Sequence, residues 1–204
     1  MRWFLATIRV RLAAAIVVAL GVVAGISRDF SIVVPTITGG SPFGAVPLNA
    51  LTPLLLIVLI GLVHDAAAPL SAQAAGRPLP SYFIVSHLVL ASLFLIIYLI
   101  VTALLFGAPA DEVVRNTCGY LSVTTAASYL LNMKLAPMVP VIFVLISAVF
   151  GRDFAGNTEP WAWPVHSSSS IEMSIAIIVA VLISLYAIVR PPSLGGSTLA
   201  ALSK

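Results

Sequence analysis

The chain has 204 residues, of which 60% are hydrophobic and only 8% are charged, and its formal net charge is +3. Soluble domains carry about 25% charged residues, so this composition lacks the polar groups that coat a water-facing surface. The mean hydropathy of +1.13 favours a surface that faces lipid. Because the ten Lys and Arg residues lie singly near the ends of apolar runs, the basic balance indicates membrane topology, and we expect no nucleic-acid partner.

Apolar runs about as long as a bilayer crossing predict the fold. We expect an all-α, polytopic membrane protein with six transmembrane helices, forming a single transmembrane domain over residues 1–204. A basic interfacial segment, 1–11, comes first and carries Arg2, Arg9 and Arg11. The six predicted spans are about 12–27, 48–63, 82–106, 113–131, 135–150 and 171–189.

Three stretches between the spans have their own character. Residues 28–47 are rich in Pro, Gly and β-branched residues, which predicts an outer loop that is partly extended or dips back into the membrane. Asp111 and Glu112, with Arg115 close by, predict an exposed loop end. The 151–170 segment contains the sequence WAWP, whose tryptophans suit an interfacial aromatic belt or a short re-entrant element.

Six crossings place both termini on one side of the membrane, and the basic residues choose the side. With the termini inside, seven Lys and Arg residues fall in the cytoplasm and three outside. This distribution obeys the positive-inside rule. We therefore expect a multi-pass protein of the cell membrane with its N- and C-termini in the cytoplasm.

The sequence holds no pattern that is typical of an enzyme. It lacks GxSxG, HExxH and CxxC motifs and a P-loop. Three histidines fall at different predicted depths, which predicts no metal site, and Cys118 is the single cysteine. We expect no catalytic residues, so any work done against a gradient must come from a separate chain.

Small residues mark two predicted spans. Gly21 and Gly25 form a GxxxG pair in the first span, and Cys118, Ser122 and Ala126 follow one another at i+4 spacing in the fourth. Such stripes let helices approach closely. The second stripe is also suited to lining a path for an amphipathic substrate, and both interpretations stay open.

The order of these features resembles the membrane subunits of ABC-2-type exporters, which have the type V transporter fold. The shared features are six spans, a basic N-terminus, an inner loop after the second span and a structured outer segment before the last. Here the inner loop is 64–80, reading HDAAAPLSAQAAGRPLP. The WAWP stretch and the RNxxGYLS–TTAASYLL run also resemble small actinobacterial membrane proteins associated with ABC exporter operons.

The resemblance implies a coupling role for the inner loop, which in that family docks on the ATPase through a short helix. It gives Asp65 the place of the acidic residue that closes the second span and Arg77 that of the basic residue that follows, with Gln73 between them. It implies an ATP-driven exporter of a hydrophobic or amphipathic substrate, such as a peptide, drug or lipid.

The same resemblance implies the partners. ABC ATPase subunits would bind ATP and magnesium, this chain would bind no cofactor, and a second membrane subunit, identical or different, would complete the complex in the lipid bilayer.

Two other functions suit a six-span chain without catalytic residues. One is the substrate-binding S component of an ECF-type vitamin importer, which docks through small-residue stripes in its first span. Either Ala15 with Ala19 or Gly21 with Gly25 would serve. The other is a scaffold subunit of a membrane complex that transports nothing.

Overall fold

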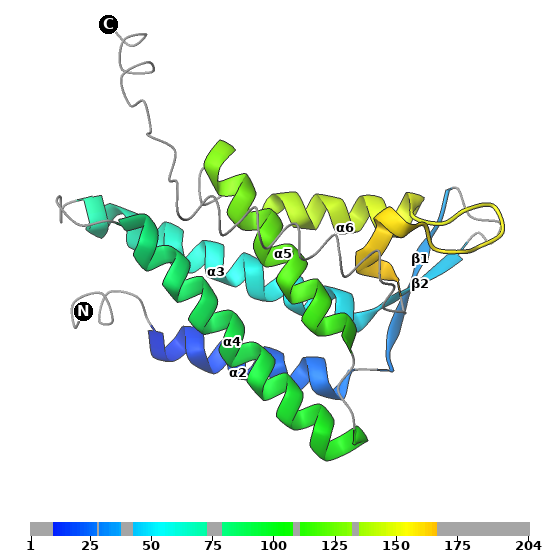
Figure 1. Ribbon diagram of the computed structural model, residues 1–204, viewed down its shortest axis with the longest axis horizontal. Helices are drawn as coiled ribbons and strands as arrows, with labels where there is room; N and C mark the ends of the chain where they lie inside the picture. Colours follow the sequence, from blue (N-terminus) through cyan, green and yellow to red (C-terminus); the bar gives the residue numbers. More distant parts are fainter. Residues whose placement is uncertain are drawn as a thin grey trace, which may run out of the picture.

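The computed structural model describes residues 10–27, 29–37, 43–72, 79–107, 111–131 and 135–166. This part of the chain is mostly helical, with one short hairpin and one 3₁₀ helix (Figure 1). In chain order the elements are α2 (Val10–Ile26), β1 (Ser31–Pro35), β2 (Phe43–Pro47), α3 (Leu48–Ala72), α4 (Leu79–Phe106), α5 (Asp111–Leu130), α6 (Met138–Phe150) and η1 (Pro160–Val165).

Helix α3 is the central element, because it contacts all four other α-helices. Helices α2 and α4 pack together on one side of it, and α5 and α6 lie on the other (Figure 1). The main core forms where these helices meet α3, and its apolar side chains remove a large area from solvent. Its largest fully buried members are Tyr98, Tyr120, Phe94, Leu56, Ile57 and Ile60.

Two glycines allow α2 and α4 to pack closely. A Cβ atom on Gly21 would lie 3.0 Å from the Cβ of Ile97, and one on Gly25 would lie 2.5 Å from Cγ1 of Val101. The GxxxG pair therefore serves packing within the chain. A similar approach joins α6 to α3, where the ring of Pro137 lies against Gly61.

One end of the helix bundle carries the segments that are not α-helical. We call residues 29–37, 43–47 and 151–166 the cap. Strands β1 and β2 pair antiparallel, with Ser31 opposite Pro47 and Pro35 opposite Phe43. A second, smaller cluster of buried residues joins the hairpin to the helix ends and η1, and it comprises Val46, Ala50, Ala148, Ala162 and Val165.

The predicted count of six transmembrane helices is wrong. Among the residues that the structure describes, one helical segment, His87–Phe106, is long and apolar enough to cross a membrane by length and composition. The apolar parts of three other helices are shorter, and they are Leu12–Ile26, Ala50–Leu62 and Met138–Phe150. The 13 residues of α6 span about 20 Å at 1.5 Å per residue, against a hydrocarbon layer of about 30 Å.

Helix α5 is unsuitable as a membrane-spanning helix for another reason. Its 20 residues would suffice in length, but charged and amide residues occupy its first two turns. The sixth predicted span, 171–189, lies outside the described residues. The assignment of both termini to the cytoplasm depended on six crossings and is withdrawn with that count.

The prediction of an all-α fold is also wrong, because β1 and β2 form a hairpin within the predicted outer loop. Ile32, Val33 and Val34 are β-branched or apolar residues that favour an extended strand. Pro35 and Pro47 lie where a strand can accept proline, with the position of the missing N–H directed away from the paired strand.

We expect Gly25→Ala to lower the free energy of unfolding by about 1–3 kcal/mol, because the added methyl group forces α2 away from Val101 on α4. Thermal unfolding of the purified protein in detergent measures the change. The matched control, Ala19→Val, adds bulk on the exposed side of α2 and should change stability by less than about 0.5 kcal/mol. If Gly25→Ala and the wild type unfolded alike, the described α2–α4 contact would be wrong.

Candidate functional site

Polar side chains gather in the interior of α5. From Glu112 to Ser128 no residue of this helix is exposed, although it is the helix richest in polar residues among those described. Burying a polar group costs free energy unless it forms hydrogen bonds. Within the described part of α5, the buried Oγ1 of Thr124 has no hydrogen-bond partner. The buried polar residues of α5 are Arg115, Asn116, Thr117, Ser122 and Thr124.

Backbone carbonyls satisfy two of these side chains at the α5–cap contact. Nη2 of Arg115 donates to the carbonyl of His166 at 2.7 Å, and its Nε donates to Oδ1 of Asn116 at 3.2 Å. Nδ2 of Asn116 donates to the carbonyl of Pro164 at 3.1 Å. The first turns of α5 are therefore joined to the end of η1, and Arg115 is buried rather than at the exposed loop end predicted from the sequence.

An indole ring completes the same contact. Trp163 lies against Gly119, where any Cβ atom would collide with the ring. Its ring centroid is 5.3 Å from that of Tyr120 and 5.8 Å from that of Phe143. The hydroxyl of Tyr120 donates to the carbonyl of Ala50 at 3.1 Å, which ties α5 to α3 beneath the ring. One tryptophan of WAWP thus packs between helices, while Trp161 is 43% exposed.

These residues were not singled out from the sequence as a group. The available signal was the i+4 spacing of Arg115 with Gly119 and of Asn116 with Tyr120 in a chain with few polar residues. Nothing in the sequence indicated that carbonyls some 50 positions later accept their hydrogen bonds.

Arg152 and Asp153 form the hydrogen bonds that fix the 151–159 loop of the cap. Nη2 of Arg152 donates to the carbonyl of Ala45 at 3.0 Å, which joins the 151–159 loop to β2. The carboxylate of Asp153 accepts hydrogen bonds from the backbone N–H and the side-chain amide of Asn157, at 2.7 and 3.1 Å. These bonds favour the charged form and lower the pKa of Asp153.

The predicted small-residue stripe follows α5 through the same region. Ser122 is buried, while Cys118, a free thiol, and Ala126 are half-buried. The structure does not bring this stripe together with Gly21 and Gly25, which face α4.

Of the residues expected to couple to an ATPase, Asp65 lies toward the end of the bundle opposite the cap. Asp65 belongs to α3, which continues to Ala72, and α4 begins at Leu79 (Figure 1). Part of the 64–80 strip is therefore a continuation of two long helices. Gln73 and Arg77 lie outside the described residues.

The N-terminal interfacial residues are mostly beyond what the structure describes. Arg2 and Arg9 precede the first described residue. Arg11 belongs to the first turn of α2, and its side chain is outside the description.

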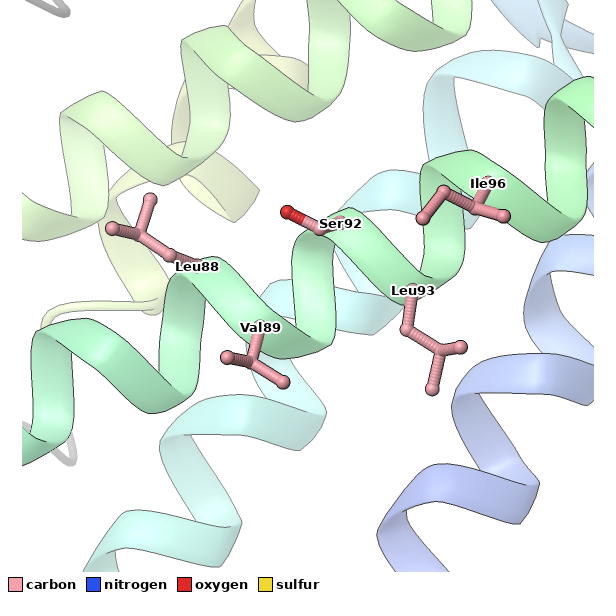
Figure 2. A pocket seen from close by; sticks show the side chains of 5 residues that line it. All are labelled: Leu88, Val89, Ser92, Leu93 and Ile96. Carbon is pink, nitrogen blue, oxygen red and sulfur yellow. The ribbon is translucent and has the colours of Figure 1, made fainter.

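A shallow surface hollow lies on the exposed face of α4, between side chains of that helix alone. It has a volume of about 360 Å³ and is lined by one hydroxyl among apolar side chains. Figure 2 shows Ser92 between Leu88 and Ile96 on successive turns of the helix, so that its small side chain leaves the hollow. The full lining is Leu88, Val89, Ser92, Leu93 and Ile96.

The comparisons give no family or homologue. No protein-family model, curated protein or solved structure matches the chain. Within the described ranges, no group of three or more His, Cys, Asp or Glu residues is placed to hold a metal ion.

We expect Gly119→Ala to displace Trp163 and to loosen the contact between α5 and the cap, because the added methyl group needs the space that the indole occupies. The tryptophan emission should shift to longer wavelength, and the protein should lose about 1–3 kcal/mol of stability. Trp161→Phe identifies the emission of the exposed indole and should leave stability nearly unchanged. An unaltered spectrum in Gly119→Ala would contradict the packing of Trp163.

We expect acid to open the turn between Asp153 and Asn157. Because the folded pKa of Asp153 is depressed, the stabilisation is present above the unfolded pKa of about 3.9 and is lost as pH falls through the folded value. The backbone N–H of Asn157 should therefore be protected from hydrogen exchange at pH 5 and lose this protection in stronger acid. In Asp153→Asn that pH dependence should disappear, and its persistence would rule out this carboxylate as the cause.

Proposed function

We propose that the chain is a multi-pass protein of the cell membrane. The observation that carries this proposal is the inverted polarity of the helices: α5, with its polar side chains, is enclosed, whereas large apolar side chains of the other helices are exposed. Examples of the exposed fraction are 79% for Leu104, 60% for Leu62 and 60% for Leu145. Many exposed large apolar side chains are unfavourable in water and are expected in contact with acyl chains.

Within the membrane, the function that we propose is that of a transmembrane subunit of an ATP-driven ABC transporter. The lengths of α3 and α4 support it, since their 25 and 28 residues correspond to about 37 and 42 Å. The apolar parts of the two helices are Ala50–Leu62 and His87–Phe106, so residues 64–72 of α3 and 79–80 of α4 extend past them on the side away from the cap. A separate ATPase that binds ATP and magnesium would dock there, through Asp65, Gln73 and Arg77.

The position of α3 provides a route for the resulting motion. Because α3 contacts all the other α-helices described here, a displacement of its end at Ala72 changes the packing of every one of them. The rings and carbonyls at the α5–cap contact hold the opposite end. The mobile part is then the half of the bundle near the 64–80 strip.

The proposed substrate is hydrophobic or amphipathic, such as a peptide, drug or lipid, and the apolar surface hollow on α4 is compatible with it. Its lining offers apolar contact over most of its area and a single hydroxyl at Ser92. A water-soluble ligand would need several converging polar groups instead.

One observation favours a second candidate, the S component of an ECF-type vitamin importer. Gly21 and Gly25 are used inside the chain, but Ala15 and Ala19 are exposed one turn apart on α2 and offer a small-residue face to another helix. Purification distinguishes the candidates, because an S component carries a bound vitamin and a transporter subunit brings an ATPase. A scaffold subunit does neither.

We expect Arg77→Glu to abolish transport and stimulation of the partner ATPase while leaving membrane insertion intact, because the reversed charge repels the docking surface. Arg77→Lys, which keeps the charge, should retain most of the activity. ATP hydrolysis by the co-purified complex measures the effect. A fully active Arg77→Glu protein would remove the 64–80 strip from the mechanism.

A further inference from the structure

The hairpin has a defined alternation of hydrogen bonds. The N–H of Leu48 donates to the carbonyl of Phe30 at 2.9 Å, so that this opposed pair is hydrogen-bonded. In an antiparallel ladder, bonded and non-bonded pairs alternate. The backbone groups of Ser31, Val33 and Pro35 on β1 therefore point away from β2.

The outer edge of β2 is already occupied. The non-bonded positions on this strand are Phe43, Ala45 and Pro47, and their backbone groups point away from β1. The carbonyl of Ala45 accepts the hydrogen bond from Arg152, and Pro47 has no N–H to offer. The contact with Arg152 independently supports the assignment of outward and inward groups.

The outer edge of β1 is open at Ser31 and Val33, whereas further along the same edge the N–H of Ile37 donates to the carbonyl of Val149 on α6 at 3.1 Å. Ser31 and Val33 are exposed, the latter by 65%, and in the part of the chain described here their outward N–H and carbonyl groups have no partner. An exposed edge strand with unpaired backbone groups is a template for another strand.

We propose that β1 pairs antiparallel with β1 of a second copy of this chain, across a twofold axis at Val33. The edge is self-complementary in that register. The N–H of Val33 donates to the carbonyl of Val33 in the second copy, and the reverse bond follows by symmetry. The N–H of Ser31 donates to the carbonyl of Pro35 in the second copy. Because proline has no N–H, only the carbonyl of Ser31 is left without a bond in this pair.

The side chains agree with this register. Ile32, which is 45% exposed, comes opposite Val34 of the second copy on the inner face of the sheet. Val33 of each copy meets its equivalent on the outer face. Cross-strand pairs of β-branched and apolar residues stabilise a sheet, and here they cover apolar surface that the single hairpin leaves exposed.

The pairing deepens the proposed function by making the second membrane subunit a copy of this chain, and in that respect it rests on it. It can be tested without an ATPase. If the chain dimerises through β1 but no ATPase activity depends on Arg77, the transporter function is refuted and the dimer is retained.

The first test is disulfide formation. In a Cys118→Ser background, Val33→Cys places two thiols on residues whose Cα atoms are about 5.5 Å apart, within the roughly 4.4–6.8 Å range of disulfides. Mild oxidation of the protein in membranes should yield a covalent dimer. Ala45→Cys, on the neighbouring strand and the same face, should stay monomeric. Equal cross-linking of both variants, or of neither, would overturn the register.

The second test removes the central donor. Val33→Pro deletes an outward N–H and leaves the β1–β2 ladder intact, and Ala45→Pro makes the same change on β2 as a matched control. Light scattering in detergent gives the mass of the particle at several concentrations. We expect Val33→Pro to weaken dimerisation by roughly tenfold or more and Ala45→Pro to leave it unchanged. A monomeric wild type, or a dimer insensitive to Val33→Pro, would refute the proposal.

Discussion

The buried polar side chains of α5 constrain the whole cap. Arg115 and Asn116 lie inside the molecule, and their desolvation is offset only if acceptors reach them. The acceptors are the carbonyls of Pro164, within η1, and of His166, which caps it. The helix and the segment after α6 are therefore coupled, and neither arrangement is favourable without the other.

The packing of Trp163 against Gly119 further fixes the position of the cap on α5. Gly119 provides a flat surface on α5 one turn after Arg115, and Trp163 fills it. Tyr120 continues the connection to α3 through the carbonyl of Ala50. Polar and aromatic contacts together orient the cap on α5, while the rest of α5 packs against the neighbouring helices, chiefly α3.

The sequence predicted local features better than their assembly. The glycine pair at Gly21 and Gly25 was predictable as a packing motif, because close approach between helices needs small residues. The burial of Arg115 was not, because its acceptor at His166 lies far along the chain and charge alone suggests exposure.

The count of membrane crossings failed because apolar runs of similar composition differ in the length of helix that they form. The run that ends at Phe150 begins its helix only at Met138, after Pro137. The 28–47 stretch was predicted to be partly extended, but the pairing of 31–35 with 43–47 was not, because its prolines suggested a loop although the edge of a strand accepts them. The coupling residues Gln73 and Arg77 stay predictions.

The junction between β2 and α3 has a mechanical consequence. Pro47 ends the strand and Leu48 begins the helix, so no linker residue separates them, and proline restricts the backbone torsion at the junction. The hydrogen bond from Leu48 to Phe30 also fixes the first helical residue to the residue that precedes β1. A rotation of α3 about its long axis is therefore transmitted to the hairpin as a change of tilt.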